Sequence, residues 1–167
     1  MSTLFGSYLD KLKANKAKIS RLTGVKTPRL NDLSNKETSK PTPIEFYRVI
    51  FTAILLKNLP EKEFENAINE IFPNRPQADF LKEFEHLSPE VRFIHKHCLT
   101  QKRVEKDISM SDGKISRLGS GDVKELEAVE FICFVEGLQL NTLQVFKELF
   151  GEINLEGSIK TEDDGNS

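Results

Sequence analysis

Apolar residues recur three and four positions apart along most of this chain, the spacing that places them on one face of an α-helix. The first stretch, with Leu4, Tyr8 and Leu12, sets the pattern. The pattern predicts an all-α protein. Helices are expected over residues 4–13, 16–23, 28–33, 43–57, 60–72, 77–87, 88–98, 101–107, 111–118, 123–138 and 142–150.

Two short helices between Leu99 and Gly121 are expected to form a helix-turn-helix. Thr100 can cap the first, because its hydroxyl accepts a hydrogen bond from a first-turn N–H, and Ser111 can cap the second in the same way. Glycine at 119 and 121 ends the second helix, since it closes a last turn in the left-handed conformation without a side-chain penalty. The residues expected to face inward are Val104, Ile108, Met110 in the turn, Ile115 and Leu118.

The same arrangement occurs 85 positions earlier. Asn15 can cap a first helix, Gly24 and Val25 form the turn, and Pro28 begins a second helix at a position where proline costs nothing. The aligned pairs are Ile19 and Val104, Val25 and Met110, Leu30 and Ile115, Leu33 and Leu118, and residues 44–46 with 129–131. This shared offset predicts an internal duplication.

The second segment contains Thr100–Gln101, an apolar residue, a turn, then Ser111 followed by I-S-R-L-x-x-G at residues 115–121. This order resembles the phage-repressor (lambda-repressor-like) helix-turn-helix family. The resemblance implies two tandem five-helix units and a sequence-specific regulator of transcription that binds double-stranded DNA. Three positions depart from the family pattern. Ser20 and Glu105 stand where the two helices usually touch through alanine, and Ser109 replaces the turn glycine.

The expected boundaries follow from these units. Residues 1–73 form the first unit, 74–87 a linking helix, 88–151 the second unit, and 152–167 an acidic tail. The tail is polar and glycine-bearing, so it cannot bury enough apolar surface to order itself and is predicted to be disordered.

Charge is distributed unevenly along the chain, although the total is only −2. Residues 1–40 hold nine basic and three acidic residues, and residues 92–121 hold seven and three. Two positive faces in an otherwise acidic chain fit a polyanionic partner. Solvated lysine-rich helices would give the same pattern, so charge alone leaves both interpretations open.

In the resembled family the second helix of each motif enters the major groove, where side chains near its N-terminus reach base edges and basic neighbours hold phosphates. Arginine suits guanine and asparagine suits adenine, because each matches two groups at once. The candidate DNA-binding residues are Lys16, Lys26, Thr27, Arg29 and Asn31 in the first unit, and Gln101, Ser111, Lys114, Ser116 and Arg117 in the second.

Other chemistry finds little support in the sequence. His95 and Cys98 share a helix face but no four-ligand set has the spacing that zinc needs, so no metal is expected. Carboxylate pairs such as Glu61 and Glu63 lie on polar faces, and no phosphate-binding loop or nucleophile motif occurs. We therefore expect no enzyme activity, no cofactor and no evident small-molecule effector.

The expected location is the cytoplasm. No apolar run approaches the length needed to cross a bilayer, so no membrane partner is expected. The N-terminus lacks a signal-peptide pattern. Cys98 and Cys133 are expected to stay reduced. An alternative function remains open: a protein-interaction or antitoxin-like adaptor, built on degenerate helix-turn-helix units, with a homodimer or another protein as partner.

Overall fold

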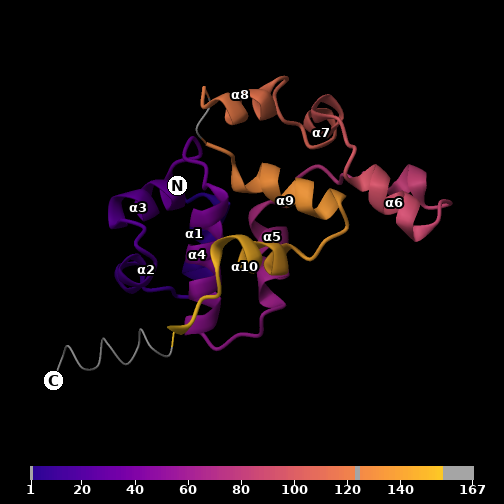
Figure 1. Ribbon diagram of the computed structural model, residues 1–167. Helices are drawn as coiled ribbons and strands as arrows, with labels where there is room; N and C mark the ends of the chain where they lie inside the picture. The colour runs from indigo at the N-terminus through magenta and orange to yellow at the C-terminus, as the bar shows by residue number, and fades with distance from the viewer. Residues whose placement is uncertain (1, 123–124, 156–167) are drawn as a thin grey trace. The chain divides into compact units, whose positions relative to one another are not determined.

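The computed structural model describes residues 2–122 and 125–155, and every regular element in these ranges is helical (Figure 1). The prediction of an all-α protein is confirmed. The α-helices are α1 Leu4–Lys11, α2 Lys16–Thr23, α3 Thr27–Asn35, α4 Pro43–Leu56, α5 Glu63–Ile71, α6 Pro89–Lys96, α7 Gln101–Asp107, α8 Lys114–Ser120, α9 Ala128–Gly137 and α10 Thr142–Phe150, with one 3-10 helix at Lys82–Phe84.

The chain divides into two compact units. Unit 1 contains residues 1–73 and the chain from Phe146 onward, and unit 2 contains residues 74–145. The boundary falls within α10, so its first four residues belong to unit 2 and the rest to unit 1.

Helix starts in unit 1 are set by side chains that bond free first-turn N–H groups. The Thr3 hydroxyl accepts from Gly6 N–H, and the Asn15 amide oxygen accepts from Lys18 N–H, as predicted for α2. Thr42 and Glu45 form a capping box at the start of α4, each side chain accepting from the other's backbone N–H. These caps explain why local sequence is sufficient to place the helix starts.

The core of unit 1 is built around α4. Its Phe46, Tyr47 and Ile50 are at most 1% exposed, and Phe64 of α5 meets both aromatic rings edge-on. Residues from beyond unit 2 complete this core. Phe146 stacks on Tyr47 with ring centroids 5.5 Å apart, and the Tyr47 hydroxyl donates to the carbonyl of Gly151 at 2.6 Å. Burial raises the pKa of Tyr47 to about 12.

Helix α1 approaches α3 closely at a glycine. A Cβ atom on Gly6 would lie 2.3 Å from the backbone oxygen of Ser34, well inside van der Waals contact. Next to this point the Thr3 hydroxyl donates to the Leu33 carbonyl at 2.7 Å, and Thr3 N–H donates to the Ser34 carbonyl at 2.8 Å. Only glycine fits at position 6 in this packing.

Unit 2 has a smaller core. Phe80, Val104, Ile108, Met110 and Cys133 form its buried cluster, with the inward positions of Val104, Ile108 and Met110 as predicted. Burial raises the pKa of the Cys133 thiol to about 11.

Three local predictions in unit 2 are wrong. The helix expected over residues 77–87 is only the 3-10 turn Lys82–Phe84, because Phe80 turns into the core and its N–H donates to the Gly137 carbonyl at 2.9 Å. Helix α9 begins at Ala128; residues 125–127 are not helical, and 123–124 lie outside the described residues. The helical spacing of Val91, Ile94 and Cys98 predicts that these residues face inward, but Ile94 is 59% exposed, and Cys98 after α6 is exposed too.

Several helices repeat at the predicted interval. Helices α6, α7 and α9 begin 85 positions after α1, α2 and α4. The turns that follow α2 and α7 share a left-handed conformation at aligned positions: Gly24, directly after α2, has φ 77°, and Ser109, two residues after the end of α7, has φ 58°.

Of the tail predicted to be disordered, residues 152–155 are described and line a pocket with residues of α2 and α4. Residues 156–167 lie outside the described residues.

Candidate nucleic-acid interface

The α2–turn–α3 segment of unit 1 exposes the N-terminal part of α3. Gly24 ends α2 in the left-handed conformation, and Pro28 lies in the first turn of α3. Leu30 and Leu33 face the core, as predicted. The opposite side of α3 is therefore presented to solvent.

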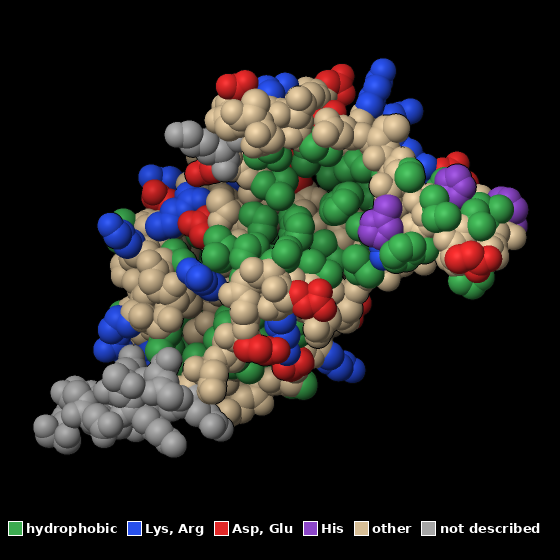
Figure 2. Space-filling model, in the orientation of Figure 1, with side chains coloured by type: hydrophobic (Ala, Val, Ile, Leu, Met, Phe, Trp, Pro, Cys, Tyr) green, Lys and Arg blue, Asp and Glu red, His purple; other side chains and the backbone are tan. Residues whose placement is uncertain are grey.

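Three of the candidate residues on this side are exposed: Lys26, Thr27 and Asn31. Among the described residues, their side chains have no hydrogen-bonding or ionic partner. Lys16, at the first position of α2, is half-exposed. Lys and Arg side chains lie over α2 and α3 at the left of the molecule in Figure 2. This surface carries positive charge and unpaired polar groups together.

Arg29 is placed differently from its neighbours on α3. Its Nε and one terminal nitrogen donate to the two carboxylate oxygens of Glu45 at 2.7 and 2.9 Å, and the guanidinium also donates to the Lys40 carbonyl. Burial raises the pKa of Glu45, but hydrogen bonds from Arg29 and from Thr42 N–H outweigh it, so the pKa is lowered overall. In this arrangement Arg29 fixes α3 to the start of α4.

Lys114 of unit 2 has the equivalent partner. Its ammonium group lies 2.6 Å from a carboxylate oxygen of Glu130, and both side chains are at most 13% exposed. Glu130 also closes a capping box with Glu127 at the start of α9. The ion pair and the capping box thus recur 85 positions after those of Arg29, Glu45 and Thr42.

The pairing of Arg29 with Glu45 and of Lys114 with Glu130 was not predicted from the sequence. A usable signal was present, since in both halves a basic residue is followed 16 positions later by a glutamate. The spacing becomes meaningful only when the two halves are aligned.

Helix α8 of unit 2 is capped in an unexpected way. It begins at Lys114 after Gly113, not at Ser111, and the predicted Ser111 cap is wrong. The carboxylate of Glu105, 3% exposed as a residue, accepts from Gly113 N–H at 3.0 Å and Ile115 N–H at 2.8 Å. The side chain that looked too large for the contact between the helices therefore satisfies the start of α8.

The remaining candidates of unit 2 lie at the surface. Gln101, Ser111, Ser116 and Arg117 are exposed, while Ile115 and Leu118 are only half-buried. The Arg117 guanidinium donates to the Asp112 carbonyl at 2.9 Å and to the Ser111 hydroxyl at 3.3 Å. These contacts hold Arg117 along the loop before α8.

Other kinds of site have little basis in residues 2–122 and 125–155. No group of three or more His, Cys, Asp or Glu residues there could hold a metal ion. None of the helices within those ranges has the length and apolar character of a membrane span.

Comparison of the chain with protein-family models, with curated proteins and with solved structures found no match.

Proposed function

We propose that this chain is a sequence-specific, double-stranded DNA-binding regulator, with α3 of unit 1 as its main recognition helix. The observation that carries the proposal is the exposed, unpartnered trio Lys26, Thr27 and Asn31 at the first turns of α3. Side chains near the start of such a helix reach base edges when the helix lies in the major groove. The ion pair between Arg29 and Glu45 joins α3 to the start of α4. A helix held in this way presents the side chains on its exposed side in one orientation.

The roles within the surface follow from side-chain chemistry. The Asn31 amide can donate to and accept from adenine in the major groove, and Thr27 can bond either partner of a base pair. Lys26 and Lys16 are suited to phosphates, where one flexible ammonium group is sufficient. Arg29 is proposed as a positioning residue, because its donors are taken up by Glu45 and the Lys40 carbonyl.

The proposal includes a tandem duplication. The equal helix starts, the paired capping boxes and the two equivalent ion pairs support unit 2 as a second, diverged helix-turn-helix unit. Gln101, Ser111, Ser116 and Arg117 would then contact DNA beside α8, with Lys114 holding α8 to α9. Two units in one chain would suit half-sites about one helical turn apart.

Selection of bound sequences from a random duplex pool tests binding and specificity together. The affinity for the selected sequence should fall steeply with salt. Asn31→Ala should weaken the free energy of binding to that sequence by about 1–3 kcal/mol. Lys26→Ala should lower the slope of log affinity against log salt concentration by about 1. Lys57→Ala, an exposed lysine at the end of α4, is the matched control and should leave both unchanged. A protein that enriches no sequence and binds no duplex at low salt would overturn the proposal.

A second candidate function, a protein-interaction module, is favoured by α6. Phe93 and Ile94 are 62% and 59% exposed on one short helix, and Figure 2 shows hydrophobic and histidine side chains gathered there. Their aligned residues in unit 1, Tyr8 and Leu9, are buried, which indicates a face suited to a protein partner, here a second copy of the chain. Sedimentation equilibrium should then show self-association that Phe93→Ser with Ile94→Ser abolishes; a monomer at all concentrations contradicts it.

A further inference from the structure

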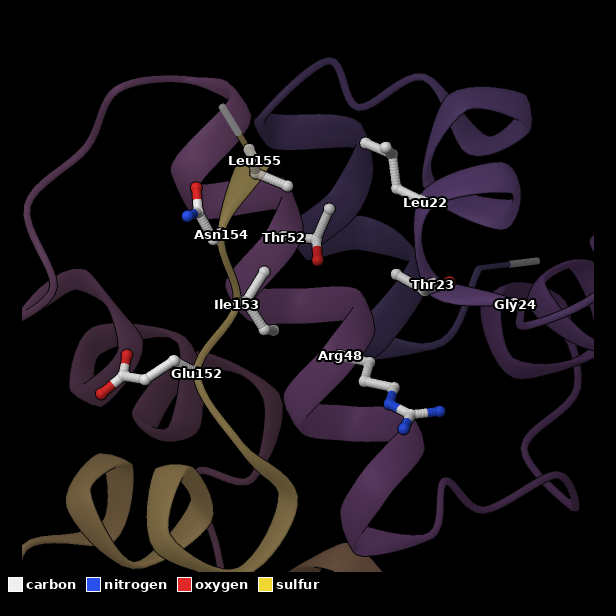
Figure 3. Close-up of a pocket in the computed structure, with 9 residues that line it drawn as sticks. All are labelled: Leu22, Thr23, Gly24, Arg48, Thr52, Glu152, Ile153, Asn154 and Leu155. Carbon is white, nitrogen blue, oxygen red and sulfur yellow. The ribbon is translucent and has the colours of Figure 1, made fainter. Parts of the chain in front are cut away.

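Unit 1 contains a pocket between the end of α2, the middle of α4 and the segment that follows α10 (Figure 3). Its volume is about 420 Å³. Leu22, Thr23 and Gly24 line it from α2 and the turn, and Arg48 and Thr52 from α4. Residues 152–155 form the remaining wall.

Thr52 supplies a buried hydroxyl without a partner. The residue is 1% exposed, and its hydroxyl makes no hydrogen bond with any part of the chain that the structure describes. Thr23 shows the usual arrangement, since its hydroxyl donates to the Ile19 carbonyl at 2.7 Å and accepts from Val25 N–H. Buried polar groups are nearly always hydrogen-bonded, so the Thr52 hydroxyl indicates a missing partner on the pocket side.

Arg48 lies one helical turn before Thr52, so both residues line the same face of α4. Arg48 is exposed and has no ion pair or hydrogen bond among the described residues. Glu152, an acidic residue of the lining, lies 3.6 Å from the ammonium group of Lys147. In Figure 3 the Glu152 carboxylate and the Arg48 guanidinium point in opposite directions. The guanidinium is therefore available to an anion.

The rest of the lining is partly apolar. Leu22, Ile153 and Leu155 come from two separate segments, and in Figure 3 Ile153 and Leu155 lie on one side of Thr52 and Leu22 on the other. A guanidinium fits a carboxylate through two parallel hydrogen bonds. A ligand with a carboxylate at one end and a short aliphatic body would satisfy both kinds of lining.

We propose that this pocket binds a small aliphatic carboxylate. The carboxylate pairs with Arg48 and accepts a hydrogen bond from the Thr52 hydroxyl, and the aliphatic body packs against Leu22, Ile153 and Leu155. Gly24, which also lines the pocket, is the turn residue that leads into α3. Ligand binding is therefore linked to the presentation of α3, and this linkage, unlike the binding itself, rests on the proposed DNA-binding function.

Calorimetric titration of the full chain with four probes tests the headgroup and the body separately. Hexanoate should bind with saturation, whereas hexanol, hexylammonium and inorganic phosphate should bind at least tenfold more weakly. Hexanol binding as tightly as hexanoate would overturn the carboxylate assignment. Phosphate binding as tightly as hexanoate would overturn the assignment of an aliphatic body to the ligand. Absence of hexanoate binding would overturn the proposal.

Variants locate the site. Arg48→Gln should weaken hexanoate binding at least tenfold, and Thr52→Val, which keeps the side-chain shape, should weaken it several-fold. Arg92→Gln in unit 2 makes the same change outside the pocket and should have no effect. Circular dichroism melting establishes that each variant is folded; a folded Arg48→Gln protein that binds hexanoate normally contradicts the site.

The DNA affinity is measured in a separate titration, with and without saturating hexanoate. A change in affinity of threefold or more supports the linkage to α3. Hexanoate binding with no effect on DNA affinity overturns the linkage alone. Hexanoate binding by a protein that binds no DNA overturns the proposed function and leaves the pocket assignment standing.

Discussion

Glu105 illustrates how residues at aligned positions of two helix pairs can have different roles. Where two short helices touch closely, the contact favours a small residue, and α2 has Ser20 at the position aligned with Glu105. Glu105 instead points its carboxylate at two backbone N–H groups at the start of α8. These N–H groups have no partner within α8 itself, and the positive end of a helix favours an anion.

The pH dependence of stability should reveal this cap. Hydrogen bonds from Ile115 N–H and then Gly113 N–H lower the pKa of Glu105 from its ordinary 4.5. A lowered folded-state pKa stabilises the protein fully above the unfolded-state value, and this stabilisation is lost as the pH falls below 4.5 through the lower folded value. Glu105→Gln should therefore lower the urea midpoint at pH 7 more than at pH 3.

The control for this prediction is Glu125→Gln, because Glu125 is exposed. Its urea midpoint should follow the wild type at both pH values. A Glu105→Gln protein whose midpoint differs from the wild type equally at pH 3 and pH 7 would show that the carboxylate charge has no part in the cap.

The candidate site was only partly predictable at the level of single residues. The inward residues of both motifs and the exposure of Lys26, Thr27 and Asn31 follow from helical periodicity. The ion pairs of Arg29 with Glu45 and of Lys114 with Glu130 do not follow from periodicity. They depend on which glutamate of the next helix lies opposite the basic side chain. Side-chain partners of this kind are set by tertiary packing, which spacing within one helix does not report.

At the level of elements, α1 and α6 differ in burial although they occupy aligned positions. Their starts lie 85 positions apart, and Tyr8 and Leu9 of α1 align with the apolar residues Phe93 and Ile94 of α6. Helix α1 buries Phe5, Tyr8 and Leu9, whereas α6 buries no residue. The aligned partner of Gly6 is Val91, and a Cβ at Gly6 already meets the Ser34 oxygen at 2.3 Å. A valine at this point excludes the close approach that α1 makes.

Gly6→Val tests this explanation by placing the residue of α6 into α1. The added side chain cannot be accommodated against backbone, so α1 must shift away from α3, and overpacking of this kind costs about 1–3 kcal/mol or more. The free energy of unfolding from urea titration measures the loss. Ser7→Val, the exposed neighbour on α1, carries the same β-branched penalty without the contact, and it should cost less than about 1 kcal/mol. Equal losses in the two variants would contradict the close-approach argument.

Most helices were predictable because their ends are coded locally. Caps at Asn15, Thr42 and Thr100 and the glycine end of α8 are properties of a few neighbouring residues. The segment before α6 was not predictable in this way. Its apolar residues have helical spacing, but Phe80 is buried beside Gly137 instead of lying on a helix. The missing side chain of Gly137 leaves room for the Phe80 ring. Such a choice depends on residues almost 60 positions away.

At the level of the whole molecule, the two units differ in how much apolar surface they bury. Unit 1 contains a cluster of fully buried aromatic rings, while neither α6 nor α8 of unit 2 has a buried residue. Backbone hydrogen bonds protected by few apolar contacts open more readily. Local stability should therefore follow the burial of each helix.

Hydrogen exchange measured by mass spectrometry should show this difference. Amides of α4 should exchange slowest, and amides of α6 and α8 should exchange at least about tenfold faster than those of α1. Helices α1 and α6 form the internal comparison, since they have equal length and aligned positions. Equal protection of α1 and α6 would contradict this ordering of stability.

Unit 1 is built from two parts of the chain, residues 1–73 and the chain from Phe146 onward, with unit 2 between them. This order has a consequence during protein synthesis. Tyr47 emerges from the ribosome long before Phe146 and Gly151, the residues that stack on its ring and accept from its hydroxyl. At ordinary translation speeds the intervening unit takes about 4–14 s to make. Until Phe146 has been made, the Tyr47 ring packs only against neighbours such as Phe51 and Phe64, so the core of unit 1 is completed after unit 2 has been synthesised.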